Sequence, residues 1–474
     1  MSELLRPDLC IIGGGSAGLT VAAAAAQFGV PVVLIERDRM GGDCLNYGCV
    51  PSKTLLAAGK RAQAMRQADL FGIEAVEPKI DFAALHDHIH GVIASIAPND
   101  SVERFTALGV HVIQAEARFV DKRTVEAGDV RIKARRFVVA TGSSPAVPDI
   151  PGLSATPYLT NETIFELTEP VSHLVVLGAG PVGMELAQAY RRLGAQVTVL
   201  DRGRPLSQLD EEAARVVERR LEDEGIVIHA DANVTKVETA GSGVKVRFEK
   251  HGEAMDVEGS HLLVATGRKP NIESLDLKKA KIRATDRGIR VNKRLKTRNG
   301  RVYAIGDVTG PPQFTHLASH HAELVLRNAL FRLRPALDLT RVPRTLYTDP
   351  EVAETGLTEE EARKKYSGMR ILRWPYADND RAQTESEAEG FIKVFTDRRG
   401  LILGCVIAGA NAGELIGLWV FAIAKGAKIG DIARLVLPYP TLSELAKRAA
   451  ITYYQPLMRK PYLRRIAAWL RKLG

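Results

Sequence analysis

The sequence predicts an α/β fold in which one strand–helix–strand unit occurs twice and a third, α+β region follows. Three observations support this prediction. A glycine-rich turn between an apolar strand and a helix occurs twice, and two later apolar strands both end in the letters ATG. From Arg344 onward, the pattern changes to short strands and helices typical of an antiparallel sheet with helices. Together these features indicate a chain of several domains.

The amino-acid sequence contains two copies of the strand–helix–strand unit. The first copy starts at Asp8 and reads DLCIIGGGSAGLTVAAAAAQFGVPVVLIER; the second starts at His173 and reads HLVVLGAGPVGMELAQAYRRLGAQVTVLDR. In each copy an apolar strand is followed by G-x-G-x-x-G, a helix, and a strand that ends in an acid, Glu36 or Asp201. The motif glycines, at a constant offset of 165 residues, are Gly13, Gly15 and Gly18 in the first copy and Gly178, Gly180 and Gly183 in the second.

Each part of this motif has a physical reason. The first glycine allows a tight turn, the second lets a pyrophosphate approach the backbone, and the third lets the helix pack closely on the strand. The helix N-terminus offers free N–H groups and a positive dipole to the phosphates, and the acid accepts a hydrogen bond from a ribose hydroxyl. Two copies with the same spacing disfavour a purely structural role for the glycines. We therefore predict two Rossmann-like dinucleotide-binding domains.

Further segments complete the two units. FVVATGSSP, from Phe137, and LLVATGRKPN, from Leu262, are each expected to close one unit. Asp307 follows an apolar strand in VYAIGDVTG, where its carboxylate either accepts a hydrogen bond from a polyol or caps a helix. The predicted boundaries are 1–150 and 272–342 for the first domain, 151–271 for the second, 343–455 for the third, and 456–474 for a tail.

Composition excludes several classes of protein. The chain has 474 residues, 45% of them hydrophobic, and we expect neither a membrane span nor a secretory signal, hence a cytoplasmic location. The net charge of +9 is concentrated after Leu445, where eight Lys or Arg occur without an acid. Because the rest of the chain is nearly neutral, the charge does not predict nucleic-acid binding.

Cys44 and Cys49 lie close together in GGDCLNYGCVPSK, and the chain has only four cysteines. Zinc would require two further Cys or His ligands, which the neighbouring sequence does not provide, so no metal site is predicted. A static bridge is disfavoured in the cytosol. A helix that begins near Cys49 would place a thiolate at a positive helix end and lower its pKa. The pair is therefore interpreted as a redox couple, whereas Cys10 and Cys405, in apolar strands, are expected to be buried and inert.

These motifs, with AIGD and YTDPEVAETGLT, resemble the flavin-dependent pyridine nucleotide–disulfide oxidoreductases over residues 8–455. The resemblance implies an FAD domain, an inserted NAD(P) domain, and a C-terminal interface domain that forms a homodimer. It also implies that NAD(P)H reduces FAD, and that the reduced flavin opens a Cys44–Cys49 disulfide. In this scheme Cys49 is the thiolate beside the flavin and Cys44 is the thiol that meets the substrate.

The resemblance assigns roles to further residues. Lys53 matches the lysine near flavin N5, and Glu185 matches its ion-pair partner. The residues implied for FAD binding are Gly13, Gly15, Gly18, Glu36, Gly42, Lys53, Thr141, Gly142 and Asp307. Those implied for NAD(P) binding are Gly178, Gly180, Gly183, Asp201 and Gly267. Since Asp201 would accept from a free ribose hydroxyl and repel a 2′-phosphate, NADH is favoured over NADPH, although Arg202 and Arg204 are close in sequence.

The sequence departs from the disulfide-reducing members of the family. They carry a histidine before the proline of a terminal H-P-T-x-S-E motif, and here LPYPTLSE has Tyr439 at that position and retains Glu444. A phenol with a pKa near 10 is a poor base at neutral pH. Asp43 stands where the family usually has threonine; its carboxylate either faces Cys44 and raises the pKa of that thiol, or bonds a backbone amide.

The mercuric reductase branch of the family has a tyrosine at the position of Tyr439. Tyr158 of this chain matches a second tyrosine of that branch. A soft ion such as Hg²⁺ binds a thiolate pair without an imidazole relay. The alternative for each tyrosine is ordinary packing, and the terminal cysteine pair of that branch is absent from this sequence. We therefore predict a disulfide or soft-metal acceptor. A dihydrolipoamide dehydrogenase, and a flavin redox sensor or membrane-associated electron-transfer partner, are the alternatives.

The tail has a pattern of its own. In PYLRRIAAWLRKLG, one helical face carries Leu463, Ile466, Trp469, Leu470 and Leu473, and the other carries Arg464, Arg465, Arg471 and Lys472. A basic amphipathic helix of this kind fits anionic lipid or an acidic partner, so residues 459–474 are a candidate for peripheral membrane contact. The alternative is a helix docked on its own dimer.

Overall fold

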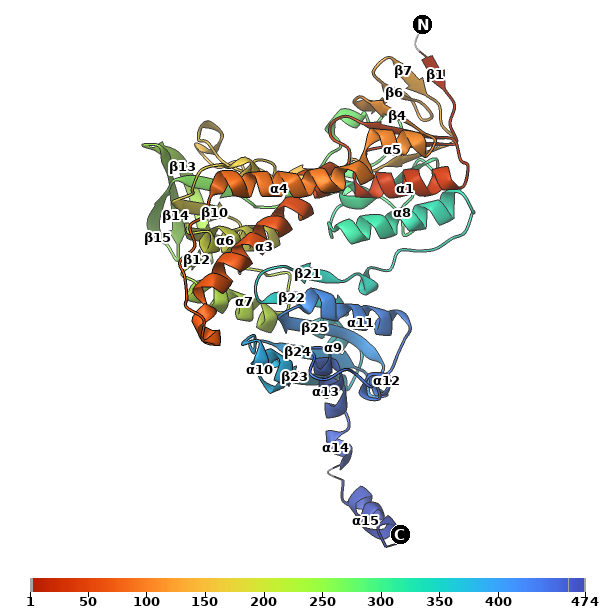
Figure 1. The fold of residues 1–474 in the computed structure, drawn as a ribbon. Coiled ribbons are helices and arrows are strands. Elements are labelled where there is room, and N and C mark those ends of the chain that lie inside the picture. Colours follow the sequence, from red (N-terminus) through yellow and green to blue (C-terminus); the bar gives the residue numbers. More distant parts are fainter. Residues whose placement is uncertain (1–2, 459, 473–474) are drawn as a thin grey trace. The chain divides into compact units, whose positions relative to one another are not determined.

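A computed structural model describes residues 3–458 and 460–472 of the chain (Figure 1). These residues form two compact units. Unit 1 comprises the residues up to 62 together with 78–202 and 231–338, and unit 2 comprises 63–77, 203–230 and the residues from 339 onward. Both parallel sheets belong to unit 1, so this division does not test the four predicted domain boundaries. They stay a prediction.

The first sheet of unit 1 is five-stranded and entirely parallel, in the order β20-β8-β2-β3-β4. Its strands are β20 (Val302–Ala304), β8 (Arg136–Val139), β2 (Leu9–Ile12), β3 (Val32–Glu36) and β4 (Val110–Gln114). All residues of β2 are buried, as expected for a parallel strand covered on both faces. Helices α1 (Ser16–Gln27) and α8 (Thr315–Ala329) lie side by side (Figure 1).

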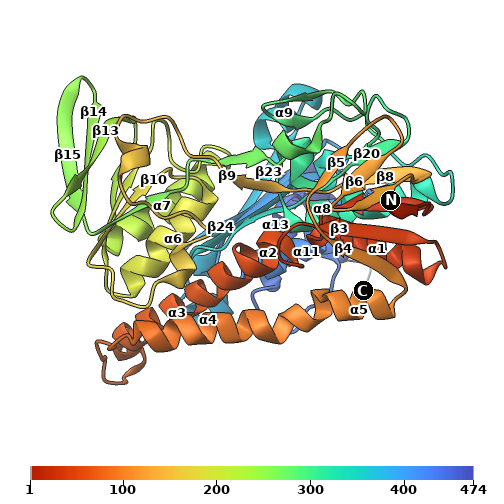
Figure 2. The ribbon, with the colours of Figure 1, turned by 90° about the horizontal axis from the view of Figure 1, so that it is seen from above.

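The second parallel sheet of unit 1 contains β10 (His173–Leu177), flanked by β11 (Gln196–Leu200) and β16 (His261–Val264). Helix α6 (Pro181–Arg192) connects β10 to β11, just as α1 connects β2 to β3. An antiparallel ribbon, visible beside this sheet in Figure 2, contains β13 (Ala232–Ala240), β14 (Gly243–Lys250) and β15 (Glu253–Gly259). The two predicted strand–helix–strand units are therefore confirmed.

Smaller elements surround these two sheets in unit 1. A four-stranded sheet has the order β1-β7-β6-β5, with β1 (Glu3–Leu5), β7 (Val130–Ile132), β6 (Val125–Ala127) and β5 (Ala117–Phe119). Two short antiparallel pairs are β9 (Ser143–Pro145) with β17 (Arg268–Pro270), and β18 (Ala284–Thr285) with β19 (Gly288–Ile289). The helices between β3 and β4 are α2 (Gly42–Asn46), α3 (Cys49–Arg66), α4 (Phe82–Ile96) and α5 (Val102–Ala107).

Unit 2 is built on a five-stranded antiparallel sheet in the order β21-β22-β25-β24-β23. Its strands are β21 (Arg344–Leu346), β22 (Glu351–Gly356), β23 (Arg370–Pro375), β24 (Phe391–Thr396) and β25 (Ile402–Gly409). Its other elements are α7 (Glu211–Asp223), β12 (Val227–His229), α9 (Glu359–Lys365), α10 (Asp380–Thr384), α11 (Ala412–Ala424), α12 (Ile429–Ala433) and α13 (Glu444–Thr452). The predicted third, α+β region is confirmed.

Two helices end the described chain, α14 (Gln455–Met458) and α15 (Pro461–Leu470). The predicted tail helix therefore exists, although Arg459 and Leu473 lie outside the described residues. Among the described residues of α15 none is buried, and Ile466 and Trp469 on the apolar face are 49% and 61% exposed. None of the described helices combines the length and the apolar character that crossing a bilayer requires.

Candidate active site

The first glycine turn joins β2 to α1. Gly13 has a φ of +110°, and a Cβ on it would lie 2.3 Å from the carbonyl oxygen of Ala140. A Cβ on Gly18 would lie 1.9 Å from the carbonyl oxygen of Gly13. Only glycine satisfies both constraints. Gly15 caps α1 with extended backbone, and within the described residues no side chain bonds this helix N-terminus. Its N–H groups therefore face outward, as an anion site requires.

The acid at the end of the second strand closes each turn in the same way. Glu36 accepts a hydrogen bond from the amide of Gly14. In the second copy, Asp201 accepts one from the amide of Ala179, at 2.6 Å. These donors stand at equivalent places in the two motifs. The bond fixes each carboxylate beside its glycine turn, where the predicted bond to a ribose hydroxyl would form.

The second glycine turn reproduces the geometry of the first. Gly178 has a φ of +106°, and a Cβ on Gly183 would lie 1.9 Å from the carbonyl oxygen of Gly178. Gly180 caps α6, and a Cβ on it would meet open space. Pro181 occupies the first turn of α6, where its missing N–H removes no helix bond. The predicted nucleotide turn is thus built twice in one chain.

The two ATG segments lie where the parallel strands end. Gly142 and Gly267 both have positive φ, +67° and +132°. The Thr141 hydroxyl donates to the carbonyl oxygen of Asn271 at 2.7 Å, which ties the first ATG turn to the second ATG strand. Gly42 also lies against the first turn, since a Cβ on it would lie 2.8 Å from the Cα of Gly15. Gly42, Thr141 and Gly142 therefore lie around the carboxyl end of β2, whereas Gly267 belongs to the ATG segment after β16, which packs on Gly178.

Asp307 lies at the same sheet edge, in the short helical turn after β20. Ser143 donates to its carboxylate at 2.7 Å, and the Arg268 Nε lies 3.9 Å from it. Burial raises the pKa of Asp307, whereas the Ser143 hydrogen bond and the charge of Arg268 lower it. An anchored carboxylate of this kind is suited to accept a hydrogen bond from a polyol.

The residues around the first glycine turn fit FAD. The Gly13–Gly18 cradle has no room for a Cβ at its ends, and its helix N-terminus carries uncapped amides among the described residues. Glu36 and Asp307 supply anchored carboxylates for ribose and ribityl hydroxyls. A phosphate-accepting turn flanked by two such acceptors fits a flavin dinucleotide. The second strand–helix–strand copy has the same turn and one acid, which fits NAD(P).

The cysteine pair follows directly from this unit. Cys44 lies in α2 and Cys49 is the first residue of α3, as predicted. Both are free thiols in the structure; Cys44 is half-buried and Cys49 is exposed. The Cys49 Sγ lies 3.4 Å from the Thr315 hydroxyl at the start of α8. Cys44 is therefore positioned by the short helix α2, and Cys49 by the first turn of the long helix α3.

The two thiols differ in acidity. The hydrogen bond with Cys44 lowers the pKa of Cys49 to about 6, and the Thr315 hydroxyl and the charge of Lys53 add to this effect. Desolvation by the surrounding protein and the charge of Asp43 act in the opposite direction. The same bond to Cys49, together with burial, raises the pKa of Cys44. At neutral pH the reduced pair therefore holds its negative charge on Cys49.

Lys53 and Glu185 form the predicted ion pair. The Lys53 Nζ lies 2.7 Å from the Glu185 carboxylate, and the side chains are 36% and 6% exposed. Lys53 extends from α3, one helical turn after Cys49, and Glu185 extends from α6 of the second copy. A buried carboxylate without a cation would be costly, so the pair holds the lysine in place.

The other predicted residues lie in different surroundings. Tyr158, in unit 1, packs against an apolar cluster around the second parallel sheet that includes Leu153 and Leu177. In unit 2, Tyr439 is 69% exposed and donates a hydrogen bond to Asp380 at 2.9 Å. Glu444 is the first residue of α13. The roles predicted for these three residues stay predictions.

The Asp43 carboxylate has two partners that the sequence did not predict. Its carboxylate lies 2.9 Å from the Arg268 guanidinium and accepts a hydrogen bond from the Asn161 amide at 3.2 Å. Its charge raises the pKa of Cys49. Whether Asp43 also raises the pKa of Cys44 stays a prediction. Cys10 and Cys405 are buried, and burial raises the pKa of each, so both are inert as predicted.

Sequence reasoning missed Thr315, Arg268 and Asn161. Arg268 donates to the Ser143 hydroxyl and carbonyl oxygen, both at 2.7 Å, and thereby connects Asp43 with the Asp307 group. Its position directly after the second ATG turn was the one available signal. Asn161 also donates to the carbonyl oxygen of Tyr47, within the cysteine segment. Nothing in the local sequence marks Thr315 or Asn161.

The chain matches the family described as pyridine nucleotide-disulphide oxidoreductase over residues 7–322, and the dimerisation domain of that family over 342–450. It is 36% identical to a mercuric reductase of Lysinibacillus sphaericus over 449 residues, covering 94% of this chain and 82% of the relative. It is 33% identical to a dihydrolipoyl dehydrogenase of Bacillus subtilis, covering 94% and 96%.

Solved structures give the same picture. LpdA of Mycobacterium tuberculosis matches with a TM-score of 0.86 and 28% identity, covering 94% of this chain and 99% of that chain. The Cu(II) complex of the HOCl-induced flavoprotein disulfide reductase RclA of Escherichia coli matches with a TM-score of 0.83 and 27% identity, covering 92% and 98%. The similarity therefore extends over nearly the whole chain.

Proposed function

The chain belongs to the pyridine nucleotide-disulphide oxidoreductase family, and from this premise we propose that it oxidises NADH and delivers the electrons, through Cys44 and Cys49, to a soft metal ion or a small disulfide. As a family member it is an FAD-dependent oxidoreductase that uses NAD(P)H. FAD, when bound, supplies the two-electron carrier between the nicotinamide and the cysteine pair. We place the enzyme in the cytoplasm.

The observation that carries this proposal is the asymmetry of the two thiols. Cys49, with a pKa lowered to about 6, holds the thiolate, and Cys44 keeps its proton. The family resemblance assigns Cys44 to meet the acceptor, which requires that its thiol first lose the proton, while Cys49 stays at the start of α3 beside Thr315. The Lys53–Glu185 pair fixes a cation one turn away and favours the thiolate.

The proposed acceptors follow from the proton chemistry. A disulfide acceptor consumes one NADH and one H⁺ and yields NAD⁺ and two thiols, so an acid–base group must move protons. Tyr439 is poorly suited to this, because its hydrogen bond to Asp380 raises the pKa of the phenol further. A metal-ion acceptor needs no such relay: one Hg²⁺ takes both electrons and becomes Hg⁰, or two Cu²⁺ take one electron each and become Cu⁺, while NADH becomes NAD⁺ and releases one H⁺. Mercuric reductases among the relatives, and the Cu(II) complex of RclA, are in line with this choice.

A panel of acceptors tests the proposal. Purified holoenzyme is assayed with NADH and, in turn, Hg²⁺, Cu²⁺, lipoamide and a quinone, and with dihydrolipoamide and NAD⁺ in the reverse direction. We expect the highest kcat/KM with a soft metal ion. Fast dihydrolipoamide oxidation would instead identify a dihydrolipoamide dehydrogenase that functions with Tyr439, as the 33% identical relative suggests. Stoichiometric reduction by NADH with slow turnover on every acceptor would indicate a redox sensor.

A homodimer is proposed because residues 342–450 match the dimerisation domain. In such a dimer, Tyr439 and Glu444 would complete the partner's site. The exposed Tyr439 is in line with this arrangement. Size-exclusion chromatography with light scattering tests it: a monomer with full activity would contradict it.

The tail is proposed to contact an anionic membrane surface. The exposed apolar residues of α15, among them Tyr462, Ile466 and Trp469, support this proposal. Deletion of 459–474 is expected to leave flavin reduction by NADH intact and to reduce sedimentation with phosphatidylserine liposomes about tenfold. Equal sedimentation of both proteins would contradict the proposal. A deletion that instead dissociates the dimer would show that the helix docks on its own dimer.

A further inference from the structure

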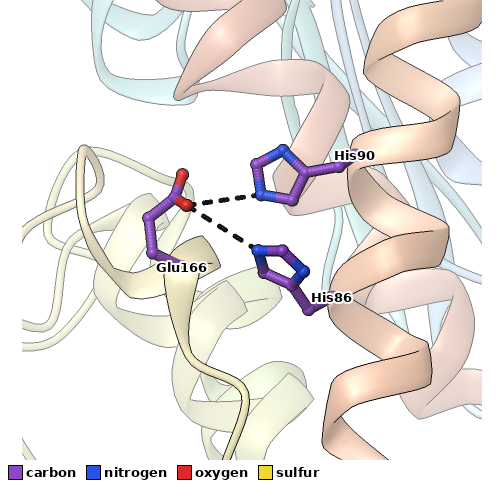
Figure 3. A group of neighbouring side chains, drawn as sticks. All are labelled: His86, His90 and Glu166. Carbon is purple, nitrogen blue, oxygen red and sulfur yellow. Dashed lines mark ion pairs between the residues drawn. The ribbon is translucent and has the colours of Figure 1, made fainter.

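Two histidines and a glutamate converge in unit 1 (Figure 3). His86 and His90 extend from α4, one helical turn apart, and Glu166 ends the short helix η4 (Ile164–Glu166). One ligand atom from each side chain lies within 4.8 Å of the other two. We infer that His86, His90 and Glu166 bind a divalent late first-row transition ion such as Zn²⁺. The sequence prediction of no metal site did not consider this group.

The distances fit such an ion. The Glu166 Oε2 lies 3.7 Å from the His86 Nε2 and 3.5 Å from the His90 Nε2. A tetrahedral centre with bonds of about 2.0–2.1 Å separates its ligand atoms by roughly 3.3–3.4 Å. Two of the three separations are therefore close to the tetrahedral value, and the third, between the ligand atoms of the two imidazoles, is within 4.8 Å. Two imidazoles and one carboxylate form a donor set typical of zinc sites, whereas Mg²⁺ and Ca²⁺ prefer oxygen ligands.

The imidazoles are prepared for this role by their other contacts. The His86 Nδ1 lies 3.1 Å from the Asp87 carboxylate. Because an ionised carboxylate only accepts, the neutral His86 ring donates from Nδ1 and leaves the lone pair of Nε2 for a ligand. The His90 Nε2 is buried and has no hydrogen-bond partner among the described residues. Such a buried nitrogen requires an explanation, and a bound ion satisfies it.

Both elements that carry the ligands are held in place. On α4, Phe82 and Ile89 are buried, and His86 and His90 flank them on the packed side of the helix. Next to Glu166, Ile164 and Phe165 are buried, and the Tyr190 hydroxyl donates to the carbonyl oxygen of Ile164 at 3.0 Å. An ion bound here would join α4 to the connection that precedes β10. The ion would therefore stabilise the folded protein, because it binds only when the two segments meet.

Zinc titration of the full-length flavoprotein, without a polyhistidine tag and with its accessible thiols alkylated, tests the inference. Calorimetry should give one Zn²⁺ per chain, unaffected by excess Mg²⁺. H86Q and H90Q should each weaken binding about tenfold or more, and E166Q should also weaken it. H88Q is the matched control, because His88 is exposed on the same helix, and it should bind as the wild type does.

Thermal unfolding supplies an independent measurement. Zn²⁺ should raise the Tm of the wild type and of H88Q, and should leave the Tm of H86Q/H90Q unchanged. Flavin content and circular dichroism confirm that each variant is folded, so that lost binding is not lost structure. Failure of the wild type to bind Zn²⁺, or equal affinity in H86Q/H90Q, would overturn the inference.

Discussion

The two glycine turns have nearly the same backbone and different chemical surroundings. Gly13 and Gly178 have φ angles of +110° and +106°, and the amides of Gly14 and Ala179 both donate to the acid of the following strand. After the acid, however, the first copy continues into α2 and α3 with the two cysteines. The second copy has no such segment in the described residues, where β11 is followed by α7.

This difference indicates that the repeated strand–helix–strand unit serves to bind a dinucleotide. The redox reactivity comes from the cysteine segment that follows the first copy at the edge of its sheet. The second copy also contributes to the first. Glu185 from α6 pairs with Lys53, and Arg268, after the second ATG turn, pairs with Asp43. Ligands bind at the carboxyl ends of parallel strands, which is where these additions gather. Four predictions test the comparison, in order of decreasing effect.

The cysteine segment is the largest difference between the copies. Cys49→Ser removes the thiolate and is expected to lower NADH-dependent turnover with Hg²⁺ or lipoamide on the order of 10³-fold. NADH:ferricyanide activity, which bypasses the cysteines, should persist, and Cys10→Ala should leave both activities unchanged because Cys10 is buried in β2. Turnover retained in Cys49→Ser would show that the pair is not on the electron path.

The two turns should fail differently when each is disrupted. A Cβ at Gly18 or at Gly183 would lie 1.9 Å from a carbonyl oxygen. Gly18→Ala should reduce the flavin content of the purified protein about tenfold or more. Gly183→Ala should keep the flavin and raise the KM for NADH by a similar factor. Gly91→Ala, where a Cβ meets open space, is the control. Loss of flavin in Gly183→Ala would contradict the assignment of the two turns.

Asp201, the acid of the second copy, should favour NADH over NADPH. Asp201→Asn retains an acceptor for the amide of Ala179 and removes the charge. We expect kcat/KM to fall about tenfold for NADH, the size of one lost charged hydrogen bond, and to rise for NADPH. Glu258→Gln, an exposed carboxylate in the same region, is the control. An unchanged ratio of the two kcat/KM values would mean that Asp201 does not contact the ribose.

The smallest expected effect concerns the acidity of Cys49. In protein reduced with dithiothreitol, its alkylation by iodoacetamide should be slow below pH 6, where the thiol is protonated, and should rise with a midpoint at about pH 6. Lys53→Gln should move the midpoint upward by less than about one pH unit, since the charge of Lys53 favours the thiolate. Peptide mass spectrometry measures the profile. Faster labelling of Cys44 would reverse the assignment.

Much of the site could be predicted from local patterns. The glycine turns, the acids that follow them and the start of α3 at Cys49 all depend on residues close together in the chain, whose steric requirements are local. The ion pair of Lys53 with Glu185 was predicted only through family resemblance, because the two residues lie in different copies. Thr315 and the metal-site candidate at Glu166 carry no such pattern and were missed.

The sequence by itself determined the turns and the helix starts, because the contact between Gly18 and the carbonyl oxygen of Gly13, and the start of α3 at Cys49, involve residues close together in the chain. The tertiary structure alone decided that Arg268 pairs with Asp43, and that Thr315 contacts Cys49. The acidity of a thiol depends on all charges and donors within a few ångströms. Folding brings these groups together from distant parts of the chain.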